Sequence, residues 1–208
     1  MEKDREPIDI LKIRLLDIMA YFYEKNTQQM DIYISLLRGI NVSGHKIIKM
    51  ELLRKMYENL GFKEVKSYIQ SGNLVFRYES GNISEIEELI KNKILKEFGF
   101  EVQIQILKPE ILKYAIHNHP FMKDENLDAK QHYFVFLNEN PSPENWEILK
   151  NMNFNGELME LGNKIIFIHY PNGAGQSKLT TNLIESKLKV SATARNLNTT
   201  KKLLEMAF

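Results

Sequence analysis

Residues 65–107, VKSYIQSGNLVFRYESGNISEIEELIKNKILKEFGFEVQIQIL, decide the fold of the first half of this chain. The stretch begins with two runs of β-branched and aromatic residues, Val65–Ile69 and Leu74–Tyr78. Ser71-Gly72-Asn73 lies between them, and a glycine beside an asparagine is typical of a tight hairpin turn. These residues therefore predict a pair of antiparallel strands.

The remainder of the stretch predicts a helix and then a strand. Ser84–Phe98 has helical apolar spacing, with Ser84 as the expected N-cap and Glu87 three residues later. Gly99 is the expected stop, and Glu101–Leu107 alternates as a strand does.

Upstream residues complete the pattern. Ile32–Leu37 predicts a strand, and Met50–Asn59 predicts a helix that ends before Gly61. The resulting order, β-α-β-β-α-β, is that of the ferredoxin-like motif. We therefore expect an α+β fold with antiparallel sheets.

The chain after residue 108 repeats this order. The expected elements are a helix or turn at Pro109–His117, a strand at Gln131–Leu137, a helix at Pro143–Asn151, a hairpin of Leu158–Leu161 and Lys164–His169, a helix at Ser177–Leu188, a short strand and a final helix. This order predicts two ferredoxin-like subdomains, residues 30–108 and 109–208. The prediction depends on element order alone, because no sequence repeat is detectable between the two halves.

Residues 1–29 form a separate N-terminal extension. Its apolar residues fall at helical spacing and predict one amphipathic helix: Ile8, Leu11, Leu15, Ile18, Met19 and Phe22. The apolar face of this helix must be buried against the main body of the protein, a second subunit or a partner. Acidic residues balance the basic ones here, which disfavours a membrane surface.

Composition excludes several classes of function. The 208 residues carry a net charge of only +1, so no general attraction to nucleic acid or anionic lipid is expected. The absence of cysteine excludes disulfides, thiolate metal sites and cysteine nucleophiles. No apolar run approaches the length of a membrane span or a secretory signal, so we expect a cytoplasmic protein.

Two stretches in the first half indicate an anion-binding site. In LLRGINVSGHK (36–46), Arg38 ends a predicted strand and presents a planar fork suited to carboxylate or phosphate. The glycines around it allow close backbone approach. In YIQSGN (68–73), amide and hydroxyl side chains crowd a hairpin tip expected in the same half.

Two further stretches lie in the second half. YPNGAGQSKLT (170–180) leads from a strand to a helix expected near Ser177, where backbone N–H groups favour an anion, and Lys178 adds a charge. This is not a Walker A loop, because the glycine before the lysine is absent. ATARNLNTT (192–200) has dense polar residues before the last helix.

Each stretch also has an ordinary structural interpretation. The glycines can make turns, Ser177 can be a plain N-cap, and Asn198 or Thr199 can cap the final helix. Arg38 can pair with a structural carboxylate or carbonyl.

The histidines give little indication of chemistry. His117 and His119 lie two apart, but no third metal ligand is identifiable, and we predict no metal. His132 and His169 lie on predicted strands and are interpreted as satisfied structural residues. No nucleophile–base or paired-carboxylate motif is present, so the sequence assigns neither a catalytic residue nor a cofactor.

The four stretches, in this order and at these separations, resemble an uncharacterised bacterial family, domain of unknown function 1697. The resemblance runs from about Met30 to the C-terminus and implies two ferredoxin-like subdomains. It implies no catalytic residue, because the family has no established activity. Leu197 stands where the family pattern has an aromatic residue, which removes a stacking contact there.

The leading hypothesis is a polar pocket for a small anionic ligand, such as a nucleotide or phosphorylated metabolite. The expected binding residues come from all four stretches: Arg38, Gly39, Asn41, Gly44, Gln70, Ser71, Asn73, Gly175, Ser177, Lys178, Arg195, Asn196, Asn198 and Thr199.

Two alternatives remain open. One is single-stranded nucleic-acid binding on an open sheet face, with Tyr33 and Phe76 as stacking residues. The other is an interaction scaffold, in which residues 1–29 dock to a partner or mediate an oligomer.

Overall fold

The computed structural model describes residues 30–42, 44–122 and 128–208. The predicted N-terminal helix at 1–29 lies outside these residues. The elements of the first half are β1 (Met30–Leu37), α2 (Met50–Asn59), β2 (Lys63–Tyr68), β3 (Asn73–Glu79), α3 (Ile83–Phe98) and β4 (Ile104–Leu107). Those of the second half are α4 (Pro109–His117), β5 (His132–Leu137), α5 (Pro143–Lys150), β6 (Leu158–Gly162), β7 (Ile165–His169), a 3₁₀ turn (Ala174–Gln176), α6 (Thr181–Leu188), β8 (Ala192–Asn196) and α7 (Leu197–Ala207).

The strands form two antiparallel four-stranded sheets with matching connectivity. The strand orders are β2-β3-β1-β4 and β6-β7-β5-β8. In each half the first strand lies inside the sheet and the last lies at its edge. This confirms the α+β class and the predicted element order, whereas the division between residues 108 and 109 stays a prediction.

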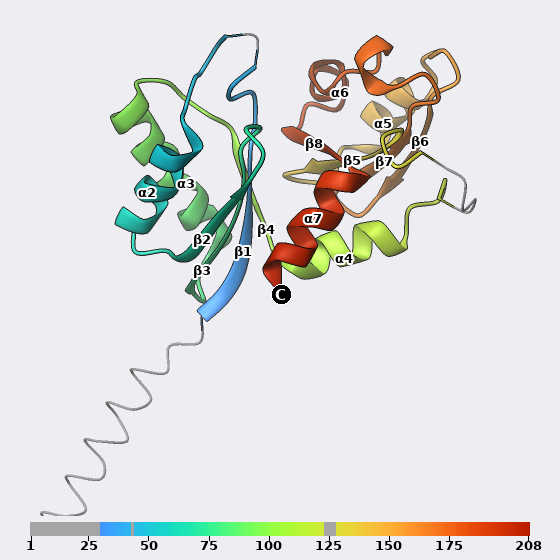
Figure 1. Cartoon of the computed structure of the whole chain (residues 1–208). Coiled ribbons are helices and arrows are strands. Elements are labelled where there is room, and N and C mark those ends of the chain that lie inside the picture. The colour runs from blue at the N-terminus through green and yellow to red at the C-terminus, as the bar shows by residue number, and fades with distance from the viewer. Residues whose placement is uncertain (1–29, 43, 123–127) are drawn as a thin grey trace, which may run out of the picture.

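Both faces of both sheets are covered. Helices α2 and α3 cover one face of the first sheet, and α5 and α6 cover one face of the second. Helices α4 and α7 lie between the sheets, where they pack on residues of both (Figure 1). This double burial explains why β1, β5 and β7 read as nearly continuous apolar runs.

Alternation along β1 shows how one strand serves two cores. Tyr33 and Leu37 pack under α2 and α3, whereas Ile34 and Leu36 face the central layer of α4 and α7. Tyr33 is stacked on Phe76 with ring centroids 5.7 Å apart, and both side chains are fully buried. Tyr33 and Phe76 are therefore core residues, the more common role for residues at such positions, and this face of the sheet is not open for base stacking.

Helix ends account for most differences from the predicted boundaries. Asn82, and not Ser84, caps α3, because its side chain accepts the Ser84 N–H. Helix α6 begins at Thr181 behind the N-cap Thr180, four residues later than predicted. The stops at Gly61 and Gly99 are confirmed: Gly99 is the left-handed C-cap of α3, and Gly61, also with positive φ, follows Leu60, the C-cap of α2. None of the described helices has the length and apolarity to cross a membrane.

Candidate functional site

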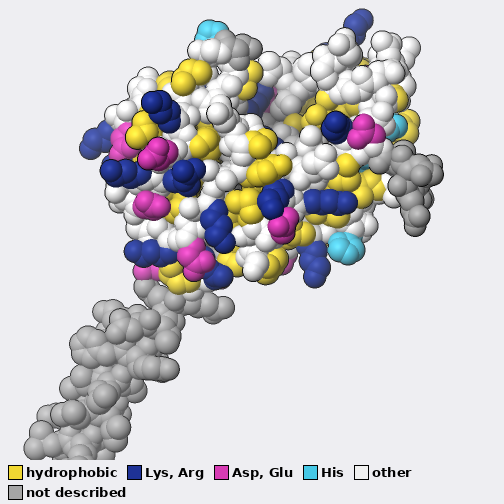
Figure 2. Space-filling model, viewed as in Figure 1, with side chains coloured by type: hydrophobic (Ala, Val, Ile, Leu, Met, Phe, Trp, Pro, Cys, Tyr) yellow, Lys and Arg dark blue, Asp and Glu magenta, His cyan; other side chains and the backbone are white. Residues whose placement is uncertain are grey.

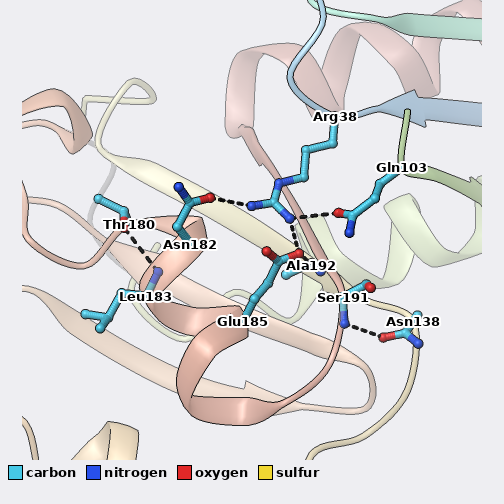
Figure 3. Close-up of polar contacts among 9 residues, drawn as sticks. All are labelled: Arg38, Gln103, Asn138, Thr180, Asn182, Leu183, Glu185, Ser191 and Ala192. Carbon is cyan, nitrogen blue, oxygen red and sulfur yellow. Dashed lines mark hydrogen bonds and ion pairs between the residues drawn. The ribbon is translucent and has the colours of Figure 1, made fainter. Parts of the chain in front are cut away.

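Arg38 follows the last residue of β1 and reaches across to the second half of the molecule. Its Nη1 donates to Oε1 of Gln103 at 2.8 Å, and its Nη2 donates to Oδ1 of Asn182 at 2.5 Å. Nη1 also forms an ion pair with Oε1 of Glu185 (Figure 3). Of the two structural partners expected for this arginine, the carboxylate is the one observed.

The partners of Arg38 on α6 are themselves held in place. Thr180 fixes the start of α6 by accepting the Leu183 N–H at 3.2 Å (Figure 3). Oε1 of Glu185 also accepts the Ala192 N–H at 2.8 Å, which ties α6 to the start of β8. Because these bonds set the position of the carboxylate, the guanidinium binds a preorganised acceptor.

A cleft of about 660 Å³ opens beside Arg38, between α3 and α6. Its lining combines cations, amides, carboxylates and two apolar side chains: Arg38, Gly39, Lys46, Glu88, Lys91, Asn92, Leu95, Glu101, Val102, Gln103 and Asn182. Lys46 donates to the Glu101 carbonyl at 2.6 Å, whereas Lys91 has no hydrogen bond or ion pair with a described residue. Volumes of this size hold nucleotide-sized ligands.

Arg195 on β8 is bound by neutral groups of the first half. Its Nε donates to Oδ1 of Asn73, and its Nη2 donates to the carbonyls of Leu37 at 2.8 Å and Ser71 at 3.2 Å. Nη1 donates to the carbonyl of Ala194. No carboxylate of the described residues pairs with it, and burial lowers its pKa to about 10. The side chain is thus a cross-link between the halves.

Asn41 organises the loop that contains the first stretch. It adopts a φ of 55°, and its side chain donates to the carbonyls of Ile48 and Gln70, both at 2.9 Å. Its Oδ1 accepts the Ile48 N–H. Gly39 and Gly44 have positive φ in the same loop. The amide of Asn41 is therefore used to tie the loop to the β2–β3 hairpin tip.

In the third stretch, α6 does not begin near Ser177 as predicted. Ser177 lies in extended backbone before α6, and its Oγ accepts the Leu179 N–H at 2.9 Å. Gly175 lies in the 3₁₀ turn, and Lys178 precedes the helix instead of standing in its first turn. No contact joins these three residues to Arg38 or Arg195.

The fourth stretch divides between two roles. Arg195 faces the first half, but the Oδ1 of Asn196 accepts the Thr199 N–H at 2.9 Å and caps α7. Neither Asn198 nor Thr199 is the cap, since both lie inside the first turn of the helix.

The structure thus brings part of the predicted set together. Ser71, Asn73 and Arg195 are in contact, and Arg38 lies one residue beyond a carbonyl that Arg195 binds. Asn41 is joined to the same hairpin tip, because its side chain donates to the Gln70 carbonyl. Ligand binding by any of these residues stays a prediction.

Sequence reasoning missed most of the cleft lining. Gln103 directly precedes β4, Asn182 lies on α6, and Lys91 lies on α3. Glu185, the ion-pair partner of Arg38, also lies on α6. Each reads in the sequence as a solvated surface position. The available signal was Arg38 itself, which needed acceptors from elsewhere in the chain.

The histidines differ from their predicted arrangement. His117 is exposed, with Nδ1 near the Lys113 carbonyl, whereas His119 is buried. His132 was interpreted as satisfied, which is wrong, because neither of its ring nitrogens has a hydrogen-bond partner in the described part of the chain. Among the described residues, no group of three or more histidine, aspartate or glutamate side chains is arranged to hold a metal.

The fold and site define an α+β protein with two four-stranded antiparallel sheets and a polar cleft between its halves. A family model described as "Protein of unknown function (DUF1697)" matches residues 30–167, and the chain belongs to this family. The match confirms the resemblance drawn from the sequence. Residues 170–180 and 192–200 lie beyond the matched range.

One solved structure shows the same fold. The conserved bacterial protein SP0830 from Streptococcus pneumoniae is 24% identical in sequence, with a TM-score of 0.69 over 86% of this chain and 99% of that chain. No protein with a curated description matches the chain.

Proposed function

We propose that the two halves are ferredoxin-like subdomains and that the cleft between them binds a small anionic ligand. The observation that carries the proposal is the position of Arg38, whose fork opens onto the cleft wall beside Lys46 and Lys91. Glu185, which pairs with Arg38, and the lining residues Glu88 and Glu101 balance these three cations, so the proposal depends on the planar guanidinium and not on an excess of charge. The amides supply orienting hydrogen bonds.

A ligand that binds Arg38 must compete with Glu185 for the guanidinium. The carboxylate already occupies Nη1, so a ligand anion binds this atom only by replacing it. Carboxylates and phosphates have the acceptor geometry for such an exchange. Arg195 is left out of the contact set, because its donors are engaged with Asn73 and backbone carbonyls.

The distribution of surface charge favours a small local anion site and not an extended surface that binds polyanions. Figure 2 shows basic side chains interspersed with acidic and apolar ones on the face drawn. The formal net charge of +1 agrees with this mixture. A small ligand held by a few converging groups is therefore favoured over an extended nucleic acid.

A thermal-shift screen tests the proposal with inorganic phosphate, pyrophosphate, citrate, AMP and glucose 6-phosphate at constant ionic strength. A probe at ~100 times its dissociation constant stabilises the protein by about 2.7 kcal/mol. We expect one of these probes to raise the thermal midpoint, Arg38→Gln to abolish the shift, and Glu185→Gln to enlarge it.

Arg54→Gln is the matched control, because Arg54 donates to Ser67 Oγ on β2 and does not line the cleft. It should keep the wild-type response. A shift that survives Arg38→Gln, or no shift with any probe, rejects the proposal.

A further inference from the structure

Three of the five histidines meet on the face of the second sheet that packs against the central layer. His132 on β5 is stacked on His169 of β7, with ring centroids 4.9 Å apart. The ring of His119, which follows α4, lies edge-on to His132 at 5.0 Å. His119 also contacts Phe134 and Phe167.

This histidine cluster is buried and poorly hydrogen-bonded. His132 is fully buried and His119 is 5% exposed. Nδ1 of His119 accepts the Phe121 N–H at 3.4 Å, so the neutral ring carries its proton on Nε2. Nε2 makes no hydrogen bond of good geometry with a described residue, although backbone groups of Tyr133 and Ile168 lie near enough to favour a protonated ring. Neither ring nitrogen of His132 has a partner among the described residues. Buried polar atoms normally find a partner, so these nitrogens call for an explanation.

The groups around the cluster cannot neutralise an added proton. His169, the nearest polar neighbour of His132, contacts only the neutral Gln131 amide at 3.3 Å. Asp128 is the one acidic side chain whose charge acts on His132, and burial together with His169 outweighs it. Backbone groups of Tyr133 and Ile168 favour a protonated His119, but burial and the neighbouring His132 and His169 outweigh them. The other neighbours of the His119 ring are phenylalanines.

We propose that this cluster is an acid-sensitive joint, in which protonation of His119 or His132 releases the end of α4 from the second sheet. A proton on either ring places a cation among apolar and histidine neighbours, where a buried charge is strongly unfavourable. His119 follows the C-terminal end of α4, and its ring packs on His132 and Phe134 of β5 and on Phe167 of β7. Release of this ring loosens the end of α4 from the second sheet, while the body of the helix stays packed on α7 and β1.

The direction of the pH effect follows from the buried state. Burial and the adjacent His132 lower the pKa of His119 from 6.5 to about 4, and burial also lowers the pKa of His132. Because the unfolded chain takes up these protons first, stability is full above pH 6.5 and is lost as the pH falls toward 4.

Thermal midpoints measured between pH 7.5 and 4.5 test the joint in His119→Leu and His132→Leu. In the wild-type protein we expect the thermal midpoint to fall by roughly 3–6 °C over this pH range. Leucine fills a similar space without a titrating group, so both variants should lose much of this pH dependence. The control His117→Gln replaces an exposed histidine and should keep the full pH dependence. An unchanged pH dependence in both leucine variants overturns the proposal.

Two measurements on the unaltered protein remain decisive if the variants do not fold. Histidine ring NMR should show His119 neutral at pH 5.5 and His132 with a pKa below its ordinary value, and a protonated His119 ring at pH 5.5 overturns the proposal. Hydrogen exchange at pH 5, corrected for intrinsic rates, should show lost protection in α4 while α3 keeps its own. An equal loss of protection in α4 and α3 would mean that the whole protein unfolds, and it overturns the proposal of a local joint.

Discussion

Nε of Arg195, on the edge strand of the second sheet, donates to Oδ1 of Asn73, at the start of β3 in the first sheet. Asn73 is fully buried and also donates to the Tyr68 carbonyl and Ser71 Oγ. One guanidinium and one amide thereby fix the hairpin tip against a strand 122 residues away. The link explains why polar residues occur at a turn that needs none for its own geometry.

Arg195→Lys should lower the free energy of unfolding by about 2 kcal/mol, because lysine keeps the charge but cannot serve the Asn73 amide and the Leu37 carbonyl together. Urea unfolding gives the value. The control Arg77→Gln breaks only an exposed ion pair with Glu64 and should change stability by less than ~0.5 kcal/mol. Equal effects of the two substitutions would mean that the Arg195 fork contributes nothing.

Gly72→Ala should be more harmful than Gly99→Ala, although both glycines have nearly the same positive φ, 74° and 79°. A methyl group at Gly72 would lie 2.6 Å from Cβ of Leu37, whereas nothing lies within 4 Å at Gly99. We expect a loss of about 1 kcal/mol at Gly99 from backbone strain alone and at least ~2 kcal/mol at Gly72. Thermal unfolding of the two variants separates packing from strain, and equal losses would refute the close contact.

Asn196→Ala should destabilise the protein by about 1 kcal/mol, because the Thr199 N–H at the start of α7 loses its acceptor. Asn198→Ala removes an exposed amide in the first turn of α7, two residues after the cap, and should change the free energy of unfolding by less than ~0.5 kcal/mol. Denaturant titrations of both variants decide between these positions. The opposite order would place the cap at Asn198, as one interpretation of the sequence had it.

The elements were predictable where local pattern and tertiary burial agree. The hairpin at 71–73 and the helix Met50–Asn59 follow from turn residues and periodicity, and both are observed. The start of α6 was not predictable, because Ser177 and Thr180 are equally good cap residues. The Ser177 side chain instead binds the N–H of Leu179, and no local pattern shows this.

Of the residues that line the cleft, only Arg38 and Gly39 were predicted as site residues. Arg38 stood out because a charged fork at the end of a buried strand needs a partner. Its partners Asn182 and Glu185 are more than 140 residues distant and lie on an amphipathic helix. Only the packing of one half on the other brings them together, and a single sequence contains no signal for that. His132 was misjudged for a related reason, since its neighbours come from another strand and from the end of α4.

A double-mutant cycle on Arg38 and Glu185 measures how strongly this pair holds the two halves together. Both side chains are about four-fifths buried, with exposed fractions of 21% and 20%, so solvent screens their attraction less than at the surface. Arg38→Gln, Glu185→Gln and the double variant should give a coupling free energy of about 1 kcal/mol that shrinks little in high salt. The exposed pair Lys202–Glu205 on α7 provides the comparison and should couple by less than ~0.5 kcal/mol. Equal coupling in the two pairs would show that the contact across the cleft is as weak as a surface ion pair, and a ligand anion would then displace Glu185 at little cost.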